Sequence, residues 1–393
     1  MIQTINVKPL SKAFLESIGF MWHTDNDDSL YVADELVVVS HDEAEAYYEA
    51  TNELYDMFVE GAGHVIDNDL FHDLNIPFNL VEVIKHSWEN DVHWHLYGRF
   101  DFAGGVDGKP IKLLEFNADT PTSLFETAIV QWAILKMNKM DEDEQFNNVF
   151  DAIKENFKRL VVLGGDTQEF EQYYEGWKIL FSSVKGSIED ENTVRFLQIA
   201  ANEAGFNTDF AYVDEVGFVG NEGIFKDDEN FEFWFKLLPW ENIAIEEPDL
   251  ALLLNEIIKE QKAIILNPAY TLIFQSKAFM KILWELFPNH PLLLETSFEP
   301  IVGKKYVEKR AFGREGANTV IYDEKGVVIE KESGEYENFT PIYQEFVDLP
   351  QDKHGQRYQA GVFFAYEACG LGFRKGGLIL NNFSKFVGHI LKG

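Results

Sequence analysis

A carboxylate and an amide stand at the end of a predicted strand, where residues of these types can bind a cation. The apolar run 111–114 predicts a buried strand, and Glu115 and Asn117 follow it at a spacing of two. Side chains two residues apart leave the same face of a strand. Oxygen ligands in this position, beside the predicted start of a helix, suit a hard metal ion or a phosphate better than a plain core strand.

A second polar pair, Arg99 and Asp101, alternates on the preceding predicted strand, and the glycine-rich segment 104–110 between the strands predicts a hairpin. A two-residue turn would place Asp101 opposite Leu114, so that the two polar pairs would leave opposite faces. A loop with an odd number of residues, 107–109, would instead oppose Asp101 to the glutamate and the arginine to the amide. We expect the odd loop, because only then do the polar groups converge.

A turn over residues 120–123 leads from the second strand towards a helix. Ser123 and Glu126 have the spacing of a capping box, and apolar residues recur at helical period through 128–135. The sequence therefore predicts a helix that begins directly beside the polar hairpin.

A basic island, residues 303–310, interrupts an otherwise acidic chain and includes Lys309. The glycine-bounded segment 312–318 follows it, and then two short predicted strands, 319–322 and 327–330. A strand with an inward lysine, a glycine loop whose backbone can approach a ligand closely, and a hairpin together predict a lid over phosphates.

Two more segments carry residues that could contribute to the site. A predicted strand at 264–266 ends at Asn267, and the helix expected after it carries Lys277 near its start. The alternating segment 343–347 predicts a strand whose edge could bind an adenine ring.

Each of these assignments has a structural alternative. Arg99 and Asp101 could form an ion pair with each other, and the Glu115–Asn117 pair could cap the following helix. Lys277 and Lys309 could be ordinary lysines of a helix and of the surface. The remaining candidates are assigned structural roles: His93 and His95, which alternate without a third metal ligand, and Cys369, a small packing residue.

Composition limits the classes of protein that this chain can be. Its 393 residues suffice for two or three lobes, and 46% hydrophobic residues exclude a disordered protein. A formal charge of −34 disfavours nucleic acid as a partner and could attract a cationic substrate. The single cysteine excludes an intramolecular disulfide. Without a signal pattern in residues 1–20 or an apolar run near twenty residues, we expect a soluble, cytoplasmic protein without a membrane partner; the oligomeric state stays open.

The rest of the chain predicts helices and an open α/β unit. A strand is expected at 36–39, and further strands at 159–163, 177–182, 211–213 and 234–240. Helices are expected after His41 and at 80–88 and 194–203.

With these pieces in order, the sequence resembles the glutathionylspermidine synthase family, specifically its ATP-dependent synthetase domain and stand-alone homologues of that domain. The resemblance rests on Gly-Arg-Phe-Asp at 98–101, the motif at 114–123, Asn267-Pro268 followed by Lys277, Phe-Gly-Arg-Glu-Gly-Ala-Asn at 312–318, and the strand at 343–347. It implies an α+β or α/β fold of ATP-grasp type, with the nucleotide between two antiparallel sheets and a pre-ATP-grasp-like α/β lobe.

The resemblance also implies how one synthetase unit, residues 1–393, is divided. Residues 1–150 would form an N-terminal helical segment with the metal and substrate hairpin, and residues 151–262 the pre-ATP-grasp-like lobe. Residues 263–350 would form the lid lobe, and residues 351–393 a C-terminal segment that completes the site.

Roles follow from the motifs that match the family. Asp101, Glu115 and Asn117 would hold Mg²⁺. Arg99 would hold the substrate carboxylate or acyl phosphate, and Arg374 the transferred phosphate. The expected ATP-binding residues are Lys277, Lys309, Gly313, Arg314, Glu315, Gly316, Gln344, Glu345, Phe346 and Val347.

The activity implied is an ATP- and Mg²⁺-dependent ligase that joins a peptide-like carboxylate to a polyamine-like amine through an acyl phosphate. Bifunctional family members add an amidase domain; this chain is short for it, and Cys369 lacks the amidase context, so synthetase chemistry alone is expected. The alternatives are an ATP-binding regulatory protein or pseudo-enzyme of the same fold, and an ATP-grasp phosphotransferase.

Overall fold

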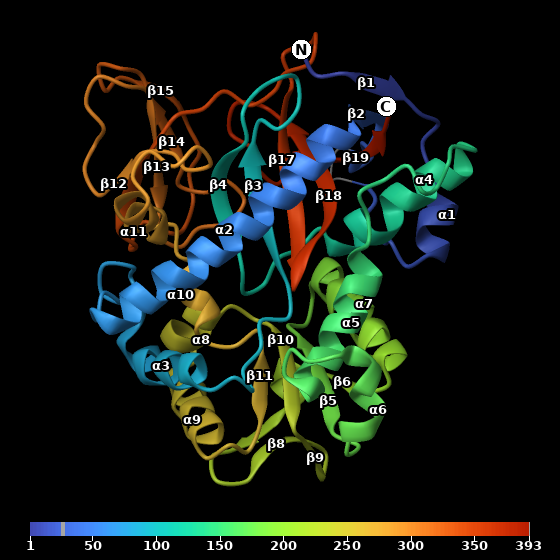
Figure 1. Ribbon diagram of the computed structural model, residues 1–393, viewed down its shortest axis with the longest axis vertical. Helices are drawn as coiled ribbons and strands as arrows, with labels where there is room; N and C mark the ends of the chain where they lie inside the picture. Colours follow the sequence, from blue (N-terminus) through green and yellow to red (C-terminus); the bar gives the residue numbers. More distant parts are fainter. Residues whose placement is uncertain (25–27, 393) are drawn as a thin grey trace.

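The polar hairpin lies at one edge of the largest sheet of the protein. In the computed structural model, which describes residues 1–24 and 28–392, this sheet has seven strands in the order β1-β2-β19-β18-β17-β3-β4 (Figure 1). All neighbours run antiparallel except β2 and β19. The strands are β1 (Thr4–Asn6), β2 (Val32–Val39), β3 (Gly98–Ala103), β4 (Lys112–Asn117), β17 (Arg357–Ala365), β18 (Glu367–Gly376) and β19 (Lys385–Leu391).

Helix α2 (His41–Asp67) crosses one face of this sheet (Figure 1). A capping box between Ser40 and Glu43 begins the helix. Its Phe58 packs edge-on against Phe100 of β3 and Phe116 of β4, with ring centroids 5.5 and 5.1 Å apart. Because strand side chains alternate, this apolar contact leaves the polar residues of β3 and β4 on the opposite face.

A parallel sheet forms the second lobe, in the order β11-β10-β5-β6. Helices cover both of its faces (Figure 1), as the predicted open α/β unit requires. The elements are β5 (Lys178–Ser183), β6 (Asn207–Tyr212), β10 (Phe233–Leu237), β11 (Ile264–Leu266), α3 (Val81–Glu89), α5 (Val149–Val162), α6 (Phe170–Tyr173), α7 (Ile188–Ala204), α8 (Trp240–Glu246) and α9 (Pro248–Lys259). A small sheet of β7 (Gly217–Val219), β8 (Gly223–Lys226) and β9 (Glu229–Phe231) adjoins it.

The predicted strand at 159–163 is wrong. Residues 159–162 form the last turn of α5, and Leu163 follows the helix with a left-handed φ of 48°. Buried apolar side chains recur along the whole helix, at Val149, Ile153, Phe157 and Leu160. This helical period overrides the short apolar run that suggested a strand.

The third lobe is an antiparallel sheet of five strands in the order β12-β16-β13-β14-β15. Figure 1 labels β12, β13, β14 and β15 of this sheet. Its strands are β12 (Thr296–Ser297), β13 (Tyr306–Arg310), β14 (Val320–Tyr322), β15 (Val328–Lys331) and β16 (Pro341–Glu345), with α10 (Thr271–Gln275) and α11 (Phe279–Leu286) before them. The hairpin expected from the sequence is present, with Gly326 at a φ of 77° between β14 and β15. We call this five-stranded unit the lid sheet.

The helix predicted after β4 is present, but the capping box is not. Residues 124–137 are helical, and they include a π-helical turn at Glu126–Val130 that continues into α4 (Gln131–Met137). Ser123 has a left-handed φ of 64°, and the Glu126 carboxylate instead accepts a hydrogen bond from the Trp22 indole at 3.0 Å. The first helix is α1 (Lys12–Ser17). Within the described part of the chain, we find no helix of the length and apolar character needed to cross a membrane.

Candidate active site

The β3–β4 hairpin has the register that brings its polar residues together. Asp101 lies opposite Glu115, and Arg99 lies opposite Asn117. This cross-strand pairing was expected, and it places all four polar side chains on one face of the sheet edge.

The route to this register differs from the odd loop that we expected. Asp107 and Gly108 both have positive φ, and the Lys109 N–H donates to the Val106 carbonyl at 3.2 Å, which is the pattern of a two-residue type I′ turn. The expected odd loop is therefore wrong. A β-bulge corrects the register further along the hairpin.

The bulge inserts Leu114 as an extra residue in β4. Phe102 pairs with Leu113, whereas the adjacent Asp101 pairs with Glu115, so Leu114 has no partner in the ladder. One extra residue shifts the register by one and returns the acidic and amide side chains to the face of Arg99.

Arg99 and Asp101 form a two-pronged ion pair. Arg99 Nε and Nη2 donate to the two carboxylate oxygens of Asp101 at 2.7 and 2.9 Å, and Nη1 donates to the Thr122 carbonyl at 2.7 Å. Asn117 also donates to Asp101, at 3.2 Å. Burial lowers the pKa of Arg99, but the Asp101 carboxylate outweighs it and holds that pKa above its ordinary value. The ion pair considered as a structural alternative is thus present, inside the cluster expected to bind metal.

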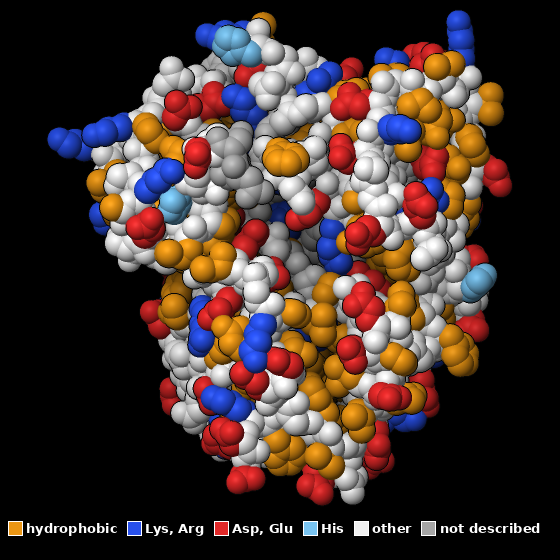
Figure 2. Space-filling view, turned by 180° about the vertical axis from the view of Figure 1, so that it is seen from behind, with side chains coloured by type: hydrophobic (Ala, Val, Ile, Leu, Met, Phe, Trp, Pro, Cys, Tyr) orange, Lys and Arg blue, Asp and Glu red, His pale blue; other side chains and the backbone are white. Residues whose placement is uncertain are grey.

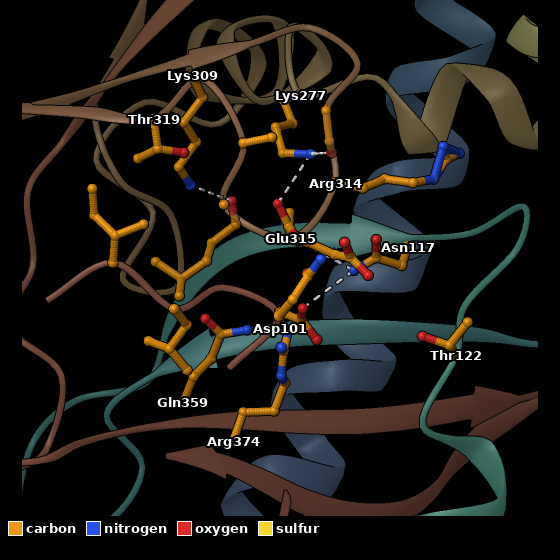
Figure 3. Close-up of a pocket in the computed structure, with 18 of the residues that line it drawn as sticks. Asp101, Asn117, Thr122, Lys277, Lys309, Arg314, Glu315, Thr319, Gln359 and Arg374 are labelled. Carbon is orange, nitrogen blue, oxygen red and sulfur yellow. Dashed lines mark hydrogen bonds and ion pairs between the residues drawn. The ribbon is translucent and has the colours of Figure 1, made fainter. Parts of the chain in front are cut away.

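Two lysines approach this cluster from the lid side (Figure 3). Lys277 Nζ lies 3.2 Å from a carboxylate oxygen of Glu115 and donates to the Gly313 carbonyl at 2.6 Å. Lys309 Nζ donates to the Gln344 side chain at 2.9 Å and to the carbonyl of the bulged Leu114 at 3.4 Å. Lys277 lies between α10 and α11 rather than inside one helix, which corrects the helix predicted around it.

The charges of Glu115 and Lys309 shift each other's ionisation. Burial opposes ionisation of Glu115, but Lys277 and then Lys309 outweigh burial and lower its pKa to about 2. Burial lowers the pKa of Lys309 to about 8, and Glu115 opposes that decrease. At neutral pH the glutamate is ionised, and the lysine is close to its titration range.

A cavity of about 820 Å³ lies between the three lobes, and every site residue predicted from the sequence lines it. The back of the molecule is hollowed here, with acidic and basic side chains at the edge of the hollow (Figure 2). Figure 3 shows Arg374 on the side of the cavity opposite the two lysines. The predicted residues that the cavity brings together are Arg99, Asp101, Glu115, Asn117, Lys277, Lys309, Gly313, Arg314, Glu315, Gly316, Gln344, Glu345, Phe346, Val347 and Arg374.

The glycine loop of the lid is attached to two other parts of the chain. Arg314 pairs with Glu241 at the start of α8, with 2.7 Å between nitrogen and oxygen. Gly316 has a φ of 71° and lies against the Leu380 carbonyl, so a side chain at this position would collide with backbone. The loop thus connects the lid sheet to the α/β lobe and to the C-terminal segment.

An acidic wall, which the sequence did not reveal, faces the cavity from the second lobe. Glu189 and Asp190 line the cavity at the start of α7, beside Glu315 of the lid loop. Burial, with the added charge of the nearby Glu126, raises the pKa of Glu189 to about 8. An acidic pair in the first turn of a helix after a serine cap is commonplace, so no local pattern marked it.

The two histidines and the cysteine, to which we assigned structural roles, are buried. His95 Nε2 lies 3.0 Å from the Ala118 carbonyl, and its Nδ1 lies 3.2 Å from the Tyr55 hydroxyl. Burial lowers the pKa of both His93 and His95 to about 4, and Cys369 is buried. Among residues 1–24 and 28–392, no three or more His, Cys, Asp or Glu side chains are grouped to hold a metal ion.

Comparison with known proteins places almost the whole chain in one family. The family model described as glutathionylspermidine synthase preATP-grasp matches residues 2–392. A protein of Haemophilus influenzae, named provisionally as an acid–amine ligase, is 30% identical over 394 residues, which cover 95% of each chain.

Two longer relatives match with lower identity. The bifunctional glutathionylspermidine synthetase/amidase of Escherichia coli is 25% identical over 87% of this chain and 56% of its own length. Trypanothione synthetase of Crithidia fasciculata is 24% identical over 82% of this chain and 51% of its own length. The chain therefore spans about half the length of these two relatives.

A solved structure resembles the fold. A glutathione synthetase-like effector of Globodera pallida superposes with a TM-score of 0.56 and 10% identity, covering 91% of this chain and 89% of the effector. This similarity supports the mixed α/β architecture with several sheets.

Proposed function

Because the chain belongs to the glutathionylspermidine synthase family, we propose that it is an ATP- and Mg²⁺-dependent ligase that joins a carboxylic acid to an amine. The chain is an enzyme of the ligase class, as its relatives' names state. The observation that carries the finer proposal is the convergence of two groups in one cavity. Arg99, Asp101, Glu115 and Asn117 line it together with Lys277 and Lys309, and Lys277 Nζ lies 3.2 Å from a carboxylate oxygen of Glu115.

We assign ATP to the space between the lid sheet and the β3–β4 edge of the large sheet, in the ATP-grasp manner. Val307, Ile321 and Phe346 give the cavity apolar lining on the lid side, which suits an adenine ring. Gln344–Val347 would border that ring, and Gly313–Gly316 would cover the phosphates. In this proposal residues 263–350 act as the lid lobe, residues 151–262 as the pre-ATP-grasp-like lobe, residues 1–150 supply the hairpin, and the segment 351–393, of which residue 393 lies outside the described residues, supplies Arg374.

The donor set of the hairpin suits a hard cation. Two carboxylates and one amide, held in cross-strand register, can supply a few oxygen ligands while phosphate oxygens and water complete the shell, as Mg²⁺ prefers. Asp101, Glu115 and Asn117 would hold the ion, and Glu115 is ionised at all physiological pH values. Bound there, Mg²⁺ would neutralise phosphate charge and orient the triphosphate.

The chain's own residues then perform three tasks in two chemical steps. A carboxylate oxygen of the acid bonds to the γ-phosphorus and ADP leaves. The neutral amine next attacks the acyl carbon, the acyl carbon–oxygen bond breaks, and the proton that the amine loses leaves with inorganic phosphate as HPO4²⁻. Arg99 would bind the acid with the two N–H donors that it does not use on Asp101 and Thr122. Lys277, Lys309 and Arg374 would neutralise the transferred phosphate, and the closed loop would exclude water that hydrolyses an acyl phosphate.

The acidic wall supports an amine as the second substrate. Glu189, Asp190 and Glu315 would attract a cation, and a polyamine carries several positive charges. The pKa of Glu189, about 8, makes this attraction dependent on pH. The glutamate is protonated below pH 8 and gains its negative charge as the pH rises through that value.

Spermidine is therefore expected to bind several-fold more tightly at pH 8.5 than at pH 6.5, with proton release on binding. Isothermal titration calorimetry in buffers of different ionisation enthalpy measures both quantities. In Glu189→Gln the proton release should disappear and the affinity should vary less with pH. Equal proton release in this variant would show that another group titrates.

The ligase activity itself is tested by combining substrates. The protein is incubated with Mg²⁺-ATP and each of a panel of acids, including glutathione and small peptides, with and without polyamines. We expect ADP release only when an acid and an amine are both present, and a product whose mass is their sum less one water. ADP release with one substrate and a phosphorylated product would indicate a phosphotransferase. Nucleotide binding without ADP release under any combination would indicate a binding protein.

A further inference from the structure

A short segment between α10 and α11 joins the polar hairpin to the lid. Gln275 ends α10, and Lys277 follows two residues later. Oε1 of Gln275 accepts hydrogen bonds from the backbone N–H groups of Ala118 at 3.0 Å and Asp119 at 3.2 Å. These are the two residues directly after Asn117, so a single side chain connects the end of β4 to the segment that carries Lys277.

The other end of this segment is attached to the lid sheet. The backbone N–H of Lys277 donates to the Ala311 carbonyl at 2.8 Å, one residue after the end of β13. Its side chain reaches Glu115 and Gly313. Lys277 is thus fixed on one side by the lid and on the other, through Gln275, by β4.

A second amide completes the attachment of β4. Asn267 is fully buried, and its Nδ2 donates to the carbonyls of Ala118 at 3.1 Å and Asp119 at 2.9 Å. All four backbone polar groups of these two residues therefore bind side-chain amides from residues 267–275. Polar backbone groups in a buried position require such partners, and their loss lets the strand end move.

We infer that Gln275 is a positioning residue, which sets the distance between the metal-ligand strand and Lys277 without touching the nucleotide. The inference rests on the nucleotide site proposed above. Gln275 is 6% exposed, and it is not among the described residues that line the cavity. The affinity for Mg²⁺-ATP depends on this distance, because a displaced Lys277 no longer makes its charge-assisted hydrogen bond to the phosphates.

The test compares Gln275→Met, which removes the acceptor, with Gln275→Glu, which retains an accepting oxygen. The matched control is Gln131→Met. Gln131 is also fully buried and makes hydrogen bonds to Thr127 and Leu371, but on helix α4, away from the lysines. Melting temperature without nucleotide and the dissociation constant for Mg²⁺-ATP, by isothermal titration calorimetry, are measured for each protein.

We expect Gln275→Met to weaken Mg²⁺-ATP binding by about 10- to 100-fold, the range for the loss of one charge-assisted hydrogen bond. Gln275→Glu should bind within about threefold of wild type, and Gln131→Met should lower the melting temperature without changing the affinity. In a Lys277→Met background, Gln275→Met should weaken binding no further, because it acts through Lys277. If Gln275→Met does not fold, Gln275→Ser, which admits water to the two N–H groups, takes its place.

Wild-type affinity in Gln275→Met, or an equal loss in the Lys277→Met background, would overturn the positioning role while leaving the ligase proposal intact. If the wild-type protein fails to bind Mg²⁺-ATP, the proposed function itself is overturned, and the inference with it.

Discussion

Glu115→Gln is expected to lower acid- and amine-dependent ADP release by about a thousandfold, the upper range for the loss of one preorganised electrostatic group. The substitution removes one of the two carboxylates proposed to bind Mg²⁺. It also removes the charge that lies 3.2 Å from Lys277. A coupled assay of ADP release at saturating Mg²⁺-ATP measures the effect.

Glu155→Gln is the matched control for this experiment. Glu155 also carries a lowered pKa and an ion pair, with Lys158 at 2.7 Å, but it lies on α5 away from the cavity. Its replacement should leave ADP release unchanged. A Glu115→Gln protein with more than about a tenth of wild-type turnover would contradict the metal-ligand role.

The cost of Glu115→Gln in stability should depend on pH in a defined direction. Glu115 has a folded-state pKa of about 2, below the value near 4.3 of an unfolded chain, so its ionisation stabilises the fold above about pH 4.3 and this contribution is lost as the pH falls towards 2. The difference in melting temperature between variant and wild type should therefore be larger at pH 7 than at pH 3. A difference independent of pH would show that lost packing, rather than lost charge, destabilises the variant.

Lys309→Met is expected to weaken Mg²⁺-ATP binding about 100-fold without lowering the melting temperature. The ammonium would contact the triphosphate, and a lost charge-assisted hydrogen bond of about 1.5–3 kcal/mol corresponds to this range. Burial already disfavours that ammonium, since it lowers the pKa of Lys309 to about 8. An apolar side chain of similar length therefore removes a strained charge from the protein without nucleotide.

Lys309→Arg separates charge from shape in the same measurement. It keeps a cation at all relevant pH values, so binding should be partly retained and should not show the weakening between pH 7 and pH 9 that we expect for the wild type. The wild-type affinity should fall as the pH rises, because the charged form of Lys309 binds phosphate and the lysine loses its charge above about pH 8, near its pKa. Unchanged affinity in Lys309→Met would show that the triphosphate lies elsewhere.

The sequence predicted the parts of the site that local patterns encode. Alternation placed Glu115 with Asn117 and Arg99 with Asp101, and the glycine-bounded lid loop follows from residue types alone. To predict that these residues share one cavity, we had to assume in addition that the polar groups converge. That assumption predicted the correct register but attributed it to an odd loop. The register comes from the β-bulge at Leu114, which has no signature in the residues around it.

Contacts between distant segments could not be predicted. Glu189 faces the cavity because α7 packs beside the parallel sheet. Gln275 binds the backbone of Ala118 and Asp119, which precede it by 157 and 156 positions in the chain. The strand predicted at 159–163 is wrong for a related reason. A short apolar run is too short to distinguish the helical period from the strand period, and only the longer pattern over α5 indicates a helix.

The extra residue in β4 has an effect that side-chain replacement cannot detect. Removing Leu114 from the chain would leave Asp101 facing Glu115 in an unbroken ladder, because the flanking pairs are already in step on either side of it. What the insertion adds is a main-chain oxygen directed at the lid. An alanine at position 114 keeps this main-chain oxygen, whereas a single-codon deletion would sever a direct link between the two sheets that enclose the proposed nucleotide.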